Sequence, residues 1–293
     1  MKVRKAVIAA AGFGTRFLPQ TKAMPKEMLP LVDKPVIQFV VEELVEAGIE
    51  NIIIVTGYHK RSIEDHFDDM SADLVKNLLE GNKTELLEKT RAVSELANFV
   101  YVRQKGPYGT GTPLLCSEQL IGDEPFIYTW ADDFIRSKPN RFTQLITAYE
   151  KYGASVLAGV RATSDADYLR YGFAGGEEVE PGIIDVNRIV EKPGVANAPS
   201  NLAANSAYLL TPNIFGYLRT ALAQKEEKNE LNYNDALKLM LADGVKVYIA
   251  EIANGKYYDA GSKLGYMQTV VDFALENPEI GEDFRKYLEK IVK

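Results

Sequence analysis

The sequence predicts an α/β fold in which a doubly wound, mostly parallel (Rossmann-like) sheet is flanked by helices. Short apolar runs that resemble strands alternate with segments of helical period, and this alternation is typical of crossover units. The runs span residues 3–10, 52–56, 99–103, 126–130 and 155–160. Several are apolar on both faces, as strands of a helix-covered parallel sheet must be. In such a sheet, ligands bind beyond the carboxyl ends of the strands.

The helical segments support the same fold. They cover residues 36–47, 72–93, 232–241 and 282–292. Gly48 is expected to stop the first, and Gly81-Asn82 should break the second into two pieces. Thr211-Pro212 has the pattern of an N-cap followed by a first-turn proline, and it predicts a further helix start. The last, charged segment is expected to pack on the body or to form an oligomer surface.

Length and composition limit the possible classes of protein. The 293 residues fit one large domain, and 46% apolar with 26% charged residues is ordinary for a globular chain with a sizeable core. No apolar run approaches the ~20 residues of a membrane span, and no signal peptide is visible. The single cysteine, Cys116, excludes an internal disulfide and favours a reducing cytoplasm.

The charge is unevenly distributed. A net charge of −7 argues against nonspecific nucleic-acid binding, which relies on a broad basic surface. Residues 1–61 nevertheless carry nine Lys or Arg against six Asp or Glu. Positive charge is therefore concentrated in the first part of the chain, where a small anionic ligand could bind.

A glycine-rich turn directly follows the first strand. It comprises Ala11, Gly12, Gly14 and Thr15. Glycine accepts positive φ and has no Cβ to keep a ligand away, so successive amide groups can form an anion-binding concavity. The turn lacks the lysine of a Walker sequence and the third glycine of a dinucleotide fingerprint. Alone, a G-x-G pair is a weak signal, and an ordinary turn is the alternative.

Basic side chains follow the turn. Arg16 offers a planar fork that suits two phosphate oxygens, whereas Lys22 and Lys26 are mobile point charges. Pro25 disfavours helix just before Lys26, so we expect Lys26 to lie on a stiff extended segment. The turn and these side chains together predict a phosphate-binding site.

Two later segments could complete a nucleotide site. Gln104 carries a donor and an acceptor that suit the edge of uracil, and Gly109 lies in a loop that permits close approach of a flat ligand. A plain loop is the alternative. The strand at 126–130 leads to Asp132 and Asp133, and Mg²⁺ prefers one or two carboxylates with phosphate oxygens. Because side chains alternate along a strand, only one should face the site; a solvated or capping turn is the alternative.

The second half offers a smaller set of candidates. Gly172 follows an irregular polar stretch, and Glu191 and Lys192 put opposite charges at the end of an apparent strand. Pro193 should hold Lys192 extended. A surface strand end explains the same residues without any ligand.

The whole string of residues 9–38 is much more specific than its glycines. It closely resembles the G-x-G-T-R…P-K signature of sugar-1-phosphate nucleotidyltransferases, and PKEMLPLVDKPVIQ is similar to the bacterial UTP:glucose-1-phosphate uridylyltransferases (UDP-glucose pyrophosphorylases). Further matching segments follow in the same order, over roughly residues 2–290. The resemblance implies synthesis of UDP-glucose and pyrophosphate from UTP and glucose 1-phosphate, with Mg²⁺ as cofactor, in a homodimer or homotetramer.

The resemblance also implies roles for individual residues. Nucleotide-binding positions would be Ala11, Gly12, Gly14, Thr15, Arg16, Lys26, Gln104, Gly109 and Asp132. Sugar-phosphate-binding positions would be Gly172, Glu191 and Lys192, in a smaller sugar-binding β subregion. Arg16, Lys26 and Lys192 would be catalytic. The segment at 259–268 resembles the D-x-G-x-K-L-G-Y-M-Q of the family, and its Asp259 would join Asp132 on the metal.

The same resemblance predicts one nucleotidyltransferase domain over residues 1–293. Residues 1–160 would be mainly its nucleotide-binding half, 161–265 mainly its sugar-phosphate half, and 266–293 its C-terminal helices. Strand and helix alternation through the first part agrees with this order.

Departures from the family pattern leave base and hexose identity open. The L-P-D strand end reads W-A-D, G-x-G-H-A reads GTGTP, and E-I-Q-L-T-D reads ELNYND at 230–235; Asn205-Ser206 replaces an apolar-glycine pair. A thymidylyltransferase is an alternative, although that branch usually has K-Q-L-L-P where this chain has KEMLP. A non-catalytic nucleotide-sugar-binding regulatory protein is another, but a binding module has no need of the full charge set.

Overall fold

The computed structural model of the chain describes residues 1–226 and 229–291. Its main sheet has nine strands in the order β5-β4-β1-β6-β11-β8-β12-β10-β9. These are β1 (Lys5–Ala10), β4 (Asn51–Thr56), β5 (Asn98–Arg103), β6 (Phe126–Trp130), β8 (Ser155–Arg161), β9 (Gly172–Glu180), β10 (Ile183–Glu191), β11 (Leu202–Leu210) and β12 (Val247–Glu251). The α/β class is confirmed, and the first five predicted strands lie within two residues of their expected bounds.

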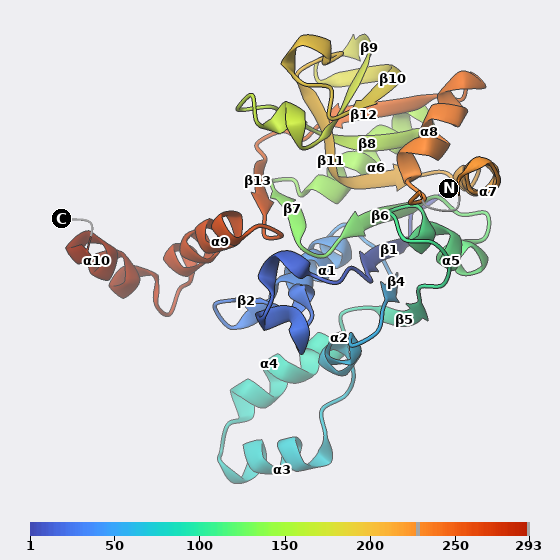
Figure 1. The fold of residues 1–293 in the computed structure, drawn as a ribbon. Coiled ribbons are helices and arrows are strands. Elements are labelled where there is room, and N and C mark those ends of the chain that lie inside the picture. Colours follow the sequence, from blue (N-terminus) through green and yellow to red (C-terminus); the bar gives the residue numbers. More distant parts are fainter. Residues whose placement is uncertain (227–228, 292–293) are drawn as a thin grey trace.

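Helices cover both faces of this sheet (Figure 1). They are α1 (Val36–Glu46), α2 (Arg61–Phe67), α3 (Ala72–Glu80), α4 (Thr84–Ser94), α5 (Thr112–Ile121), α6 (Arg141–Tyr152), α7 (Ile214–Gln224), α8 (Tyr233–Ala242), α9 (Lys263–Glu276) and α10 (Gly281–Ile291). Adjacent residues of β1 show the layering, because Val7 belongs to the apolar cluster that contains side chains of α5, α7 and α8, whereas Ile8 belongs to the cluster that contains side chains of α1, α2 and α6. Both side chains are fully buried, as expected for an apolar strand in a sheet that helices cover on both faces.

Strand direction changes across the sheet. β5, β4, β1 and β6 are parallel, so the residues that follow them lie at one edge. β11 is antiparallel to β6 and to β8, and β9 pairs with both β10 and β11. This antiparallel part is the smaller β region. Since Ala207 of β11 lies opposite Thr129, the start of β11 lies at the carboxyl end of β6.

Two short ribbons lie outside the main sheet. They are formed by β7 (Asp133–Arg136) with β13 (Lys256–Asp259), and by β2 (Pro30–Leu31) with β3 (Lys34–Pro35). In the first, Asp259 lies directly opposite Asp133. This antiparallel pairing brings the last predicted site residue beside the end of β6.

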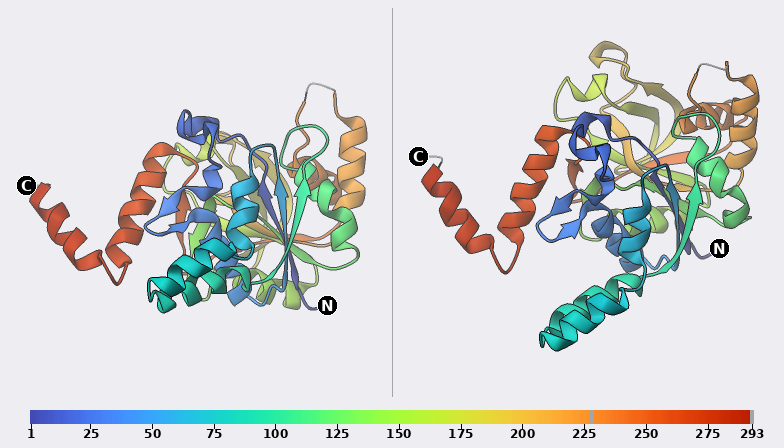
Figure 2. Two further views of the ribbon diagram at one scale, coloured as in Figure 1. Left: turned by 90° about the horizontal axis from the view of Figure 1, so that it is seen from below. Right: turned by 60° about the horizontal axis from the view of Figure 1, so that its bottom comes forward.

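The two helical extensions leave the body. The α3–α4 hairpin and the α9–α10 arm project from it in different directions (Figure 2). The predicted break at Gly81-Asn82 separates α3 from α4, and the last helix lies one residue from its predicted bounds. The start predicted at Thr211-Pro212 is wrong by two residues, because the Ile214 and Phe215 amides donate back to Thr211 and Pro212 in a turn before α7.

Among residues 1–226 and 229–291, no helix combines the length and hydropathy that a membrane span requires.

Candidate active site

The glycine-rich turn packs beneath Lys26. Gly14 adopts φ 66°, and a Cβ there would lie 3.2 Å from Lys26 Cβ and from Thr21 Cγ2. Thr21 Oγ1 donates to the Gly14 carbonyl oxygen at 2.7 Å. A Cβ on Gly12 would lie 3.7 Å from Lys26 Cε. The turn therefore depends on glycine at Gly14, and the lysine side chain lies directly over it.

Lys26 is held differently from the prediction. It begins a single 3-10 turn, Lys26–Met28, because the Met28 and Leu29 amides donate to the carbonyls of Pro25 and Lys26. Lys26 therefore lies in a helical turn between Pro25 and Leu29, so the predicted extended conformation of Lys26 is wrong. The amine of Lys26 lies 2.7 Å from Asp132 Oδ2. Burial alone would lower the pKa of Lys26, but the attraction of Asp132 and Glu27, together with the hydrogen bond to Asp132, outweighs burial and the pKa is raised.

Gly261 is the point at which the charged side chains meet. A Cβ on Gly261 would lie 2.8 Å from Asp132 Oδ2, 3.1 Å from Asp259 Oδ1 and 3.7 Å from Arg16 Nη1. The two carboxylate oxygens are therefore no farther apart than the sum of the first two distances. Arg16 Nη1 also donates to the Gly261 carbonyl oxygen at 3.4 Å. Side chains from three distant segments thus converge on a position that only glycine can occupy.

Sequence reasoning missed Gly261 as this meeting point. The available signal was the glycine two residues after Asp259 in the D-x-G pattern. Its amide donates to Asp259 Oδ1 at 3.0 Å, which turns that carboxylate toward the site.

Asp132 and Asp133 have different surroundings. Asp132 pairs with Lys26, whereas Oδ1 of Asp133 is buried without a hydrogen-bond partner among the described residues. Burial raises the pKa of Asp133 to about 7, against the opposing effect of Arg141. The fully buried Arg141 donates to the Asp133 carbonyl oxygen and to Ser206 Oγ.

This environment predicts a pH-dependent effect of Asp133→Asn. The folded pKa, about 7, exceeds the ordinary value of 3.8, so the folded state binds more protons between these values and loses stability as pH rises through them. Asparagine stays neutral. Urea unfolding at about pH 5 and pH 8 should therefore show a stability difference that shifts in favour of the variant as pH rises. The exposed Asp73→Asn serves as a control, and parallel pH curves for wild type and Asp133→Asn would contradict the prediction.

The loop after β5 is held in place by backbone contacts with Leu231. Gly109 has φ 121°, and a Cβ there would overlap the carbonyl oxygen of Leu231. Gly111 N donates to Leu231 O at 2.8 Å, and Leu231 N donates to Tyr108 O at 2.9 Å. The sequence predicted that a flat ligand would come close to the backbone of Gly109. In the structure the backbone of Leu231 occupies that space instead. Gln104 lies at the carboxyl end of β5, where its backbone N–H donates to Thr56 O.

An aromatic pair connects this loop with the glycine-rich turn. The rings of Phe13 and Tyr108 meet edge to face with centroids 5.6 Å apart. Both side chains are nevertheless more than 60% exposed. Sequence reasoning did not single them out, because an isolated aromatic residue in a loop carries no pattern.

Gly172, Glu191 and Lys192 lie together in the smaller β region. Gly172 is the cross-strand partner of Glu191 and also pairs with Ala204 at the start of β11. A Cβ on Gly172 would lie 2.8 Å from Glu191 Oε2. These residues therefore lie near the carboxyl end of β6, at the edge where the glycine-rich turn is found.

The backbone of Lys192 contradicts the expected extended conformation. Its φ is 46°, in the left-handed region. The Lys192 amide donates to Tyr171 O at 3.0 Å, and the Gly194 amide donates to Tyr168 O at 3.1 Å. These two bonds tie the end of β10 to the segment before β9 and accompany a bend at Lys192, in place of the extended conformation that Pro193 favours for the residue before it.

The two carboxylates suit a magnesium ion better than a metal that requires three or more protein ligands. No group of three or more His, Cys, Asp or Glu in the described parts of the chain could hold a metal ion. Mg²⁺ needs only one or two carboxylates because substrate phosphates and waters complete its octahedron. Asp132 and Asp259, which meet beside Gly261, supply that number.

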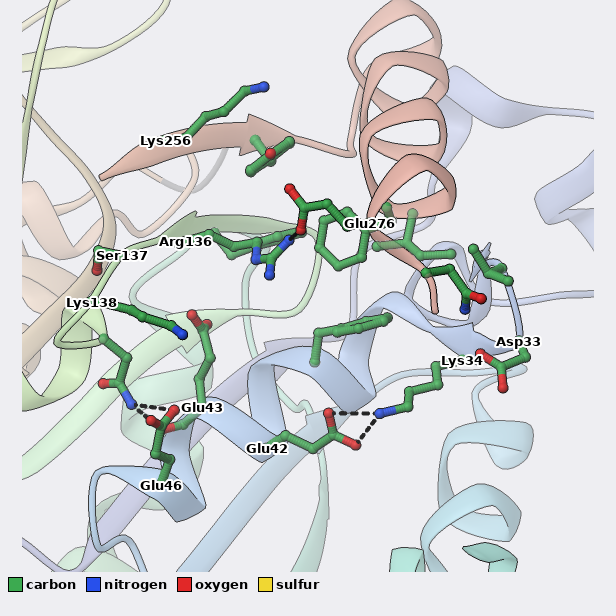
Figure 3. A pocket seen from close by; sticks show the side chains of 18 of the residues that line it. Asp33, Lys34, Glu42, Glu43, Glu46, Arg136, Ser137, Lys138, Lys256 and Glu276 are labelled. Carbon is green, nitrogen blue, oxygen red and sulfur yellow. Dashed lines mark hydrogen bonds and ion pairs between the residues drawn. The ribbon is translucent and has the colours of Figure 1, made fainter. Parts of the chain in front are cut away.

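Two cavities lie outside this cluster of charges. One, of about 830 Å³, is lined by α1, β7, β13 and α9. In it, the Glu43 carboxylate of α1 lies beside the Lys138 amine and Arg136 pairs with Glu276 (Figure 3). None of the predicted site residues lines it. The other, of about 440 Å³, includes Tyr171 and Asn205 and so adjoins the Gly172 side of the site.

Comparison with known proteins gives a consistent result. Residues 5–274 match the family described as nucleotidyl transferase. A UTP–glucose-1-phosphate uridylyltransferase 2 of Staphylococcus saprophyticus is 47% identical over 291 residues, covering 99% of this chain and 98% of the relative.

Solved structures agree along nearly the whole chain. UTP-bound UGPase from Acinetobacter baumannii is 35% identical with a TM-score of 0.89, covering 98% of this chain and 99% of its own. A UDP-glucose pyrophosphorylase complexed with UDP-glucose is 39% identical with a TM-score of 0.82, covering 94% and 100%.

Nucleotidyltransferases of this family generally use a divalent metal, which agrees with the paired carboxylates. Sequence, fold and the converging charges all lead to one assignment. The chain belongs to the nucleotidyl transferase family, and within it to the bacterial-type UTP–glucose-1-phosphate uridylyltransferases.

Proposed function

We propose that this enzyme joins UTP and glucose 1-phosphate into UDP-glucose and pyrophosphate. The observation that carries the proposal is the convergence of Arg16, Lys26, Asp132 and Asp259 at the carboxyl edge of the sheet. A reaction between two phosphorylated substrates needs cationic groups and a metal in one place. Similarity to uridylyltransferases along the full chain supports uracil and glucose as the two specific partners.

The reaction is a direct displacement. An oxygen of the sugar phosphate attacks the α-phosphorus of UTP, a new O–P bond forms, and the bond to the oxygen bridging the α- and β-phosphorus breaks. Pyrophosphate leaves with that oxygen. No side chain needs to form a covalent intermediate, so catalysis rests on positioning and on charge stabilisation.

The cationic side chains have separate roles. Arg16 neutralises the departing pyrophosphate, and its contact with Gly261 holds the guanidinium beside the carboxylates. Lys26 contacts the nucleotide phosphates from above the turn. Lys192 aligns the attacking phosphate, since two anions must approach each other in one site.

Asp132 and Asp259 are the residues that would hold Mg²⁺. The ion, when bound, supplies positive charge to the nucleotide oxygens. Lys26 and the Gly261 amide fix the orientation of the two carboxylates through their hydrogen bonds.

The remaining predicted residues recognise the two substrates. The amides of Ala11, Gly12, Gly14 and Thr15 bind phosphate oxygens. The Gln104 side chain and the backbone of Gly109, on the side that Leu231 leaves open, bind the base. Gly172 and Glu191 bind the hexose. The chain acts as one domain over 1–293, with nucleotide binding mainly in 1–160, sugar-phosphate binding mainly in 161–265 and the C-terminal region in 266–293. The lone Cys116 fits a reducing cytoplasm.

The C-terminal arm supports assembly into a homodimer or homotetramer. α10 lies apart from the sheet and packs on α9 (Figure 1). Its Tyr287 and Ile291 are 57% and 59% exposed, and an apolar face of this kind is commonly covered by a partner. Light scattering should give the mass of two or four chains; a monomer at micromolar concentration would contradict this assembly.

Pyrophosphate release from a panel of nucleoside triphosphates and sugar 1-phosphates tests the reaction. UTP with glucose 1-phosphate and Mg²⁺ should be the best pair and should yield UDP-glucose. A preference for dTTP would instead identify a thymidylyltransferase. Binding of UDP-glucose without release from any pair would identify a regulatory protein.

A further inference from the structure

Asn234 contacts the proposed sugar-binding carboxylate. It lies in the first turn of α8, and its Nδ2 donates to Glu191 Oε2 at 3.1 Å. A Cβ on Gly172 would lie 2.8 Å from that oxygen and 3.7 Å from Asn234 Nδ2. The amide and the carboxylate therefore lie together over the same glycine.

The two partners differ in how firmly they are held. The start of α8 is anchored, because Tyr233 OH lies 2.7 Å from Tyr208 OH and the following Ala236 and Leu237 are fully buried. Glu191, by contrast, is an exposed side chain at the last residue of β10. A flexible carboxylate on a strand end is thus tied to a rigid helix by one hydrogen bond.

We propose that Asn234 is a positioning residue that orients Glu191 and thereby sets the preference among hexoses. This inference rests on the proposed role of Glu191 in sugar binding. The hydrogen bond from the Asn234 side chain occupies Oε2 of Glu191 and leaves Oε1 of that carboxylate to accept from a hydroxyl group of the sugar. Hexoses that differ only in the direction of one hydroxyl are distinguished when the accepting oxygen has a fixed position.

The residue type at 234 suits this role. The side-chain N–H of an asparagine is always the donor in a hydrogen bond to a carboxylate. This hydrogen bond therefore has a fixed direction and does not depend on pH near neutrality. Asn234→Ala removes the donor, and Asn234→Asp replaces it with a like charge beside Glu191. Lys238→Ala is a matched control on the same helix, since Lys238 forms an ion pair with Asp235.

Steady-state kinetics with each substrate varied separately test the proposal. Asn234→Ala should raise KM for glucose 1-phosphate about tenfold, the effect of one lost hydrogen bond to a charged group, and leave KM for UTP within about twofold. The ratio of kcat/KM for glucose 1-phosphate over galactose 1-phosphate should fall. Asn234→Asp should have the larger effect, and Lys238→Ala should resemble wild type.

A double-mutant cycle separates positioning from a structural role. In a Glu191→Gln background, Asn234→Ala should cause little additional loss, because the group that it orients has already been changed. Fully additive effects, or equal changes in KM for both substrates, would overturn the inference. So would an active Glu191→Gln variant with unchanged KM for glucose 1-phosphate. A wild-type enzyme that made no UDP-glucose would instead refute the proposed function.

Discussion

Asp259→Ala should lower turnover at least about 100-fold, as expected when a preorganised charge-stabilising group is lost at a reacting centre. The carboxylate meets Asp132 and Arg16 beside Gly261, so its removal leaves only one of the two proposed magnesium ligands. KM for glucose 1-phosphate should change far less than kcat. Pyrophosphate release measured over a range of Mg²⁺ concentrations is the appropriate assay.

Controls make this result specific. Asp243→Ala removes a carboxylate at the end of α8 that contacts Tyr217, and it should retain normal turnover. Higher Mg²⁺ should restore part of the Asp259→Ala activity if Asp132 still binds the ion. Near-normal, magnesium-dependent turnover in Asp259→Ala would contradict the metal assignment.

Lys60→Met should destabilise the protein by about 3–5 kcal/mol, because it leaves a buried charge unpaired. Lys60 Nζ lies 2.6 Å from Glu27 Oε2, and the two side chains are 6% and 0% exposed. Burial raises the pKa of Glu27 and lowers that of Lys60, against their mutual attraction. Without the lysine, the folded pKa of Glu27 rises further above its unfolded value. The loss should therefore be largest near neutral pH and should shrink as pH falls.

Urea unfolding followed by circular dichroism measures this effect. Lys89→Met is the matched control, since Lys89 pairs with Asp33 at 2.7 Å but both side chains are about half exposed. An exposed pair contributes no more than about 1 kcal/mol. Glu27→Gln combined with Lys60→Met should recover part of the loss because no charge remains buried. Equal destabilisation by Lys60→Met and Lys89→Met would contradict the prediction.

The strands and most helix bounds were predictable because hydrophobic period reports local structure. The runs at 52–56 and 99–103 became β4 and β5 with one extra residue each, and β6 matched completely. The misses came where hydrogen bonds override local preference. Pro25 and Pro193 suggested extended neighbours, but backbone bonds turn the chain at Lys26 and at Lys192.

The site could be predicted only in part. The glycine-rich turn and Arg16 form one continuous string, so the residues alone were enough to group them as a candidate phosphate site. Asp132 and Asp259 are far apart in the sequence and meet only because β13 pairs with β7. The family resemblance predicted that these two aspartates act together, whereas their spacing in the sequence could not have predicted it.

Other features have no sequence signal at all. The Glu27–Lys60 pair joins two segments whose charges look like ordinary surface residues in the sequence. The same holds for Asn234, which a helical pattern identifies as part of α8 without indicating that it reaches Glu191. Tertiary contacts of this kind depend on the packing of α8 and β10 rather than on local pattern.

The stereochemical course at the α-phosphorus tests the central claim most directly. UTP carrying one sulfur of defined configuration on that phosphorus would be converted with glucose 1-phosphate, and the configuration of the UDP-glucose product determined by phosphorus NMR. A single in-line attack by the sugar phosphate that Lys192 aligns, with departure of the pyrophosphate that Arg16 neutralises, predicts inversion. Retention would require a covalent nucleotidyl intermediate on a side chain and would contradict the direct displacement proposed for this site.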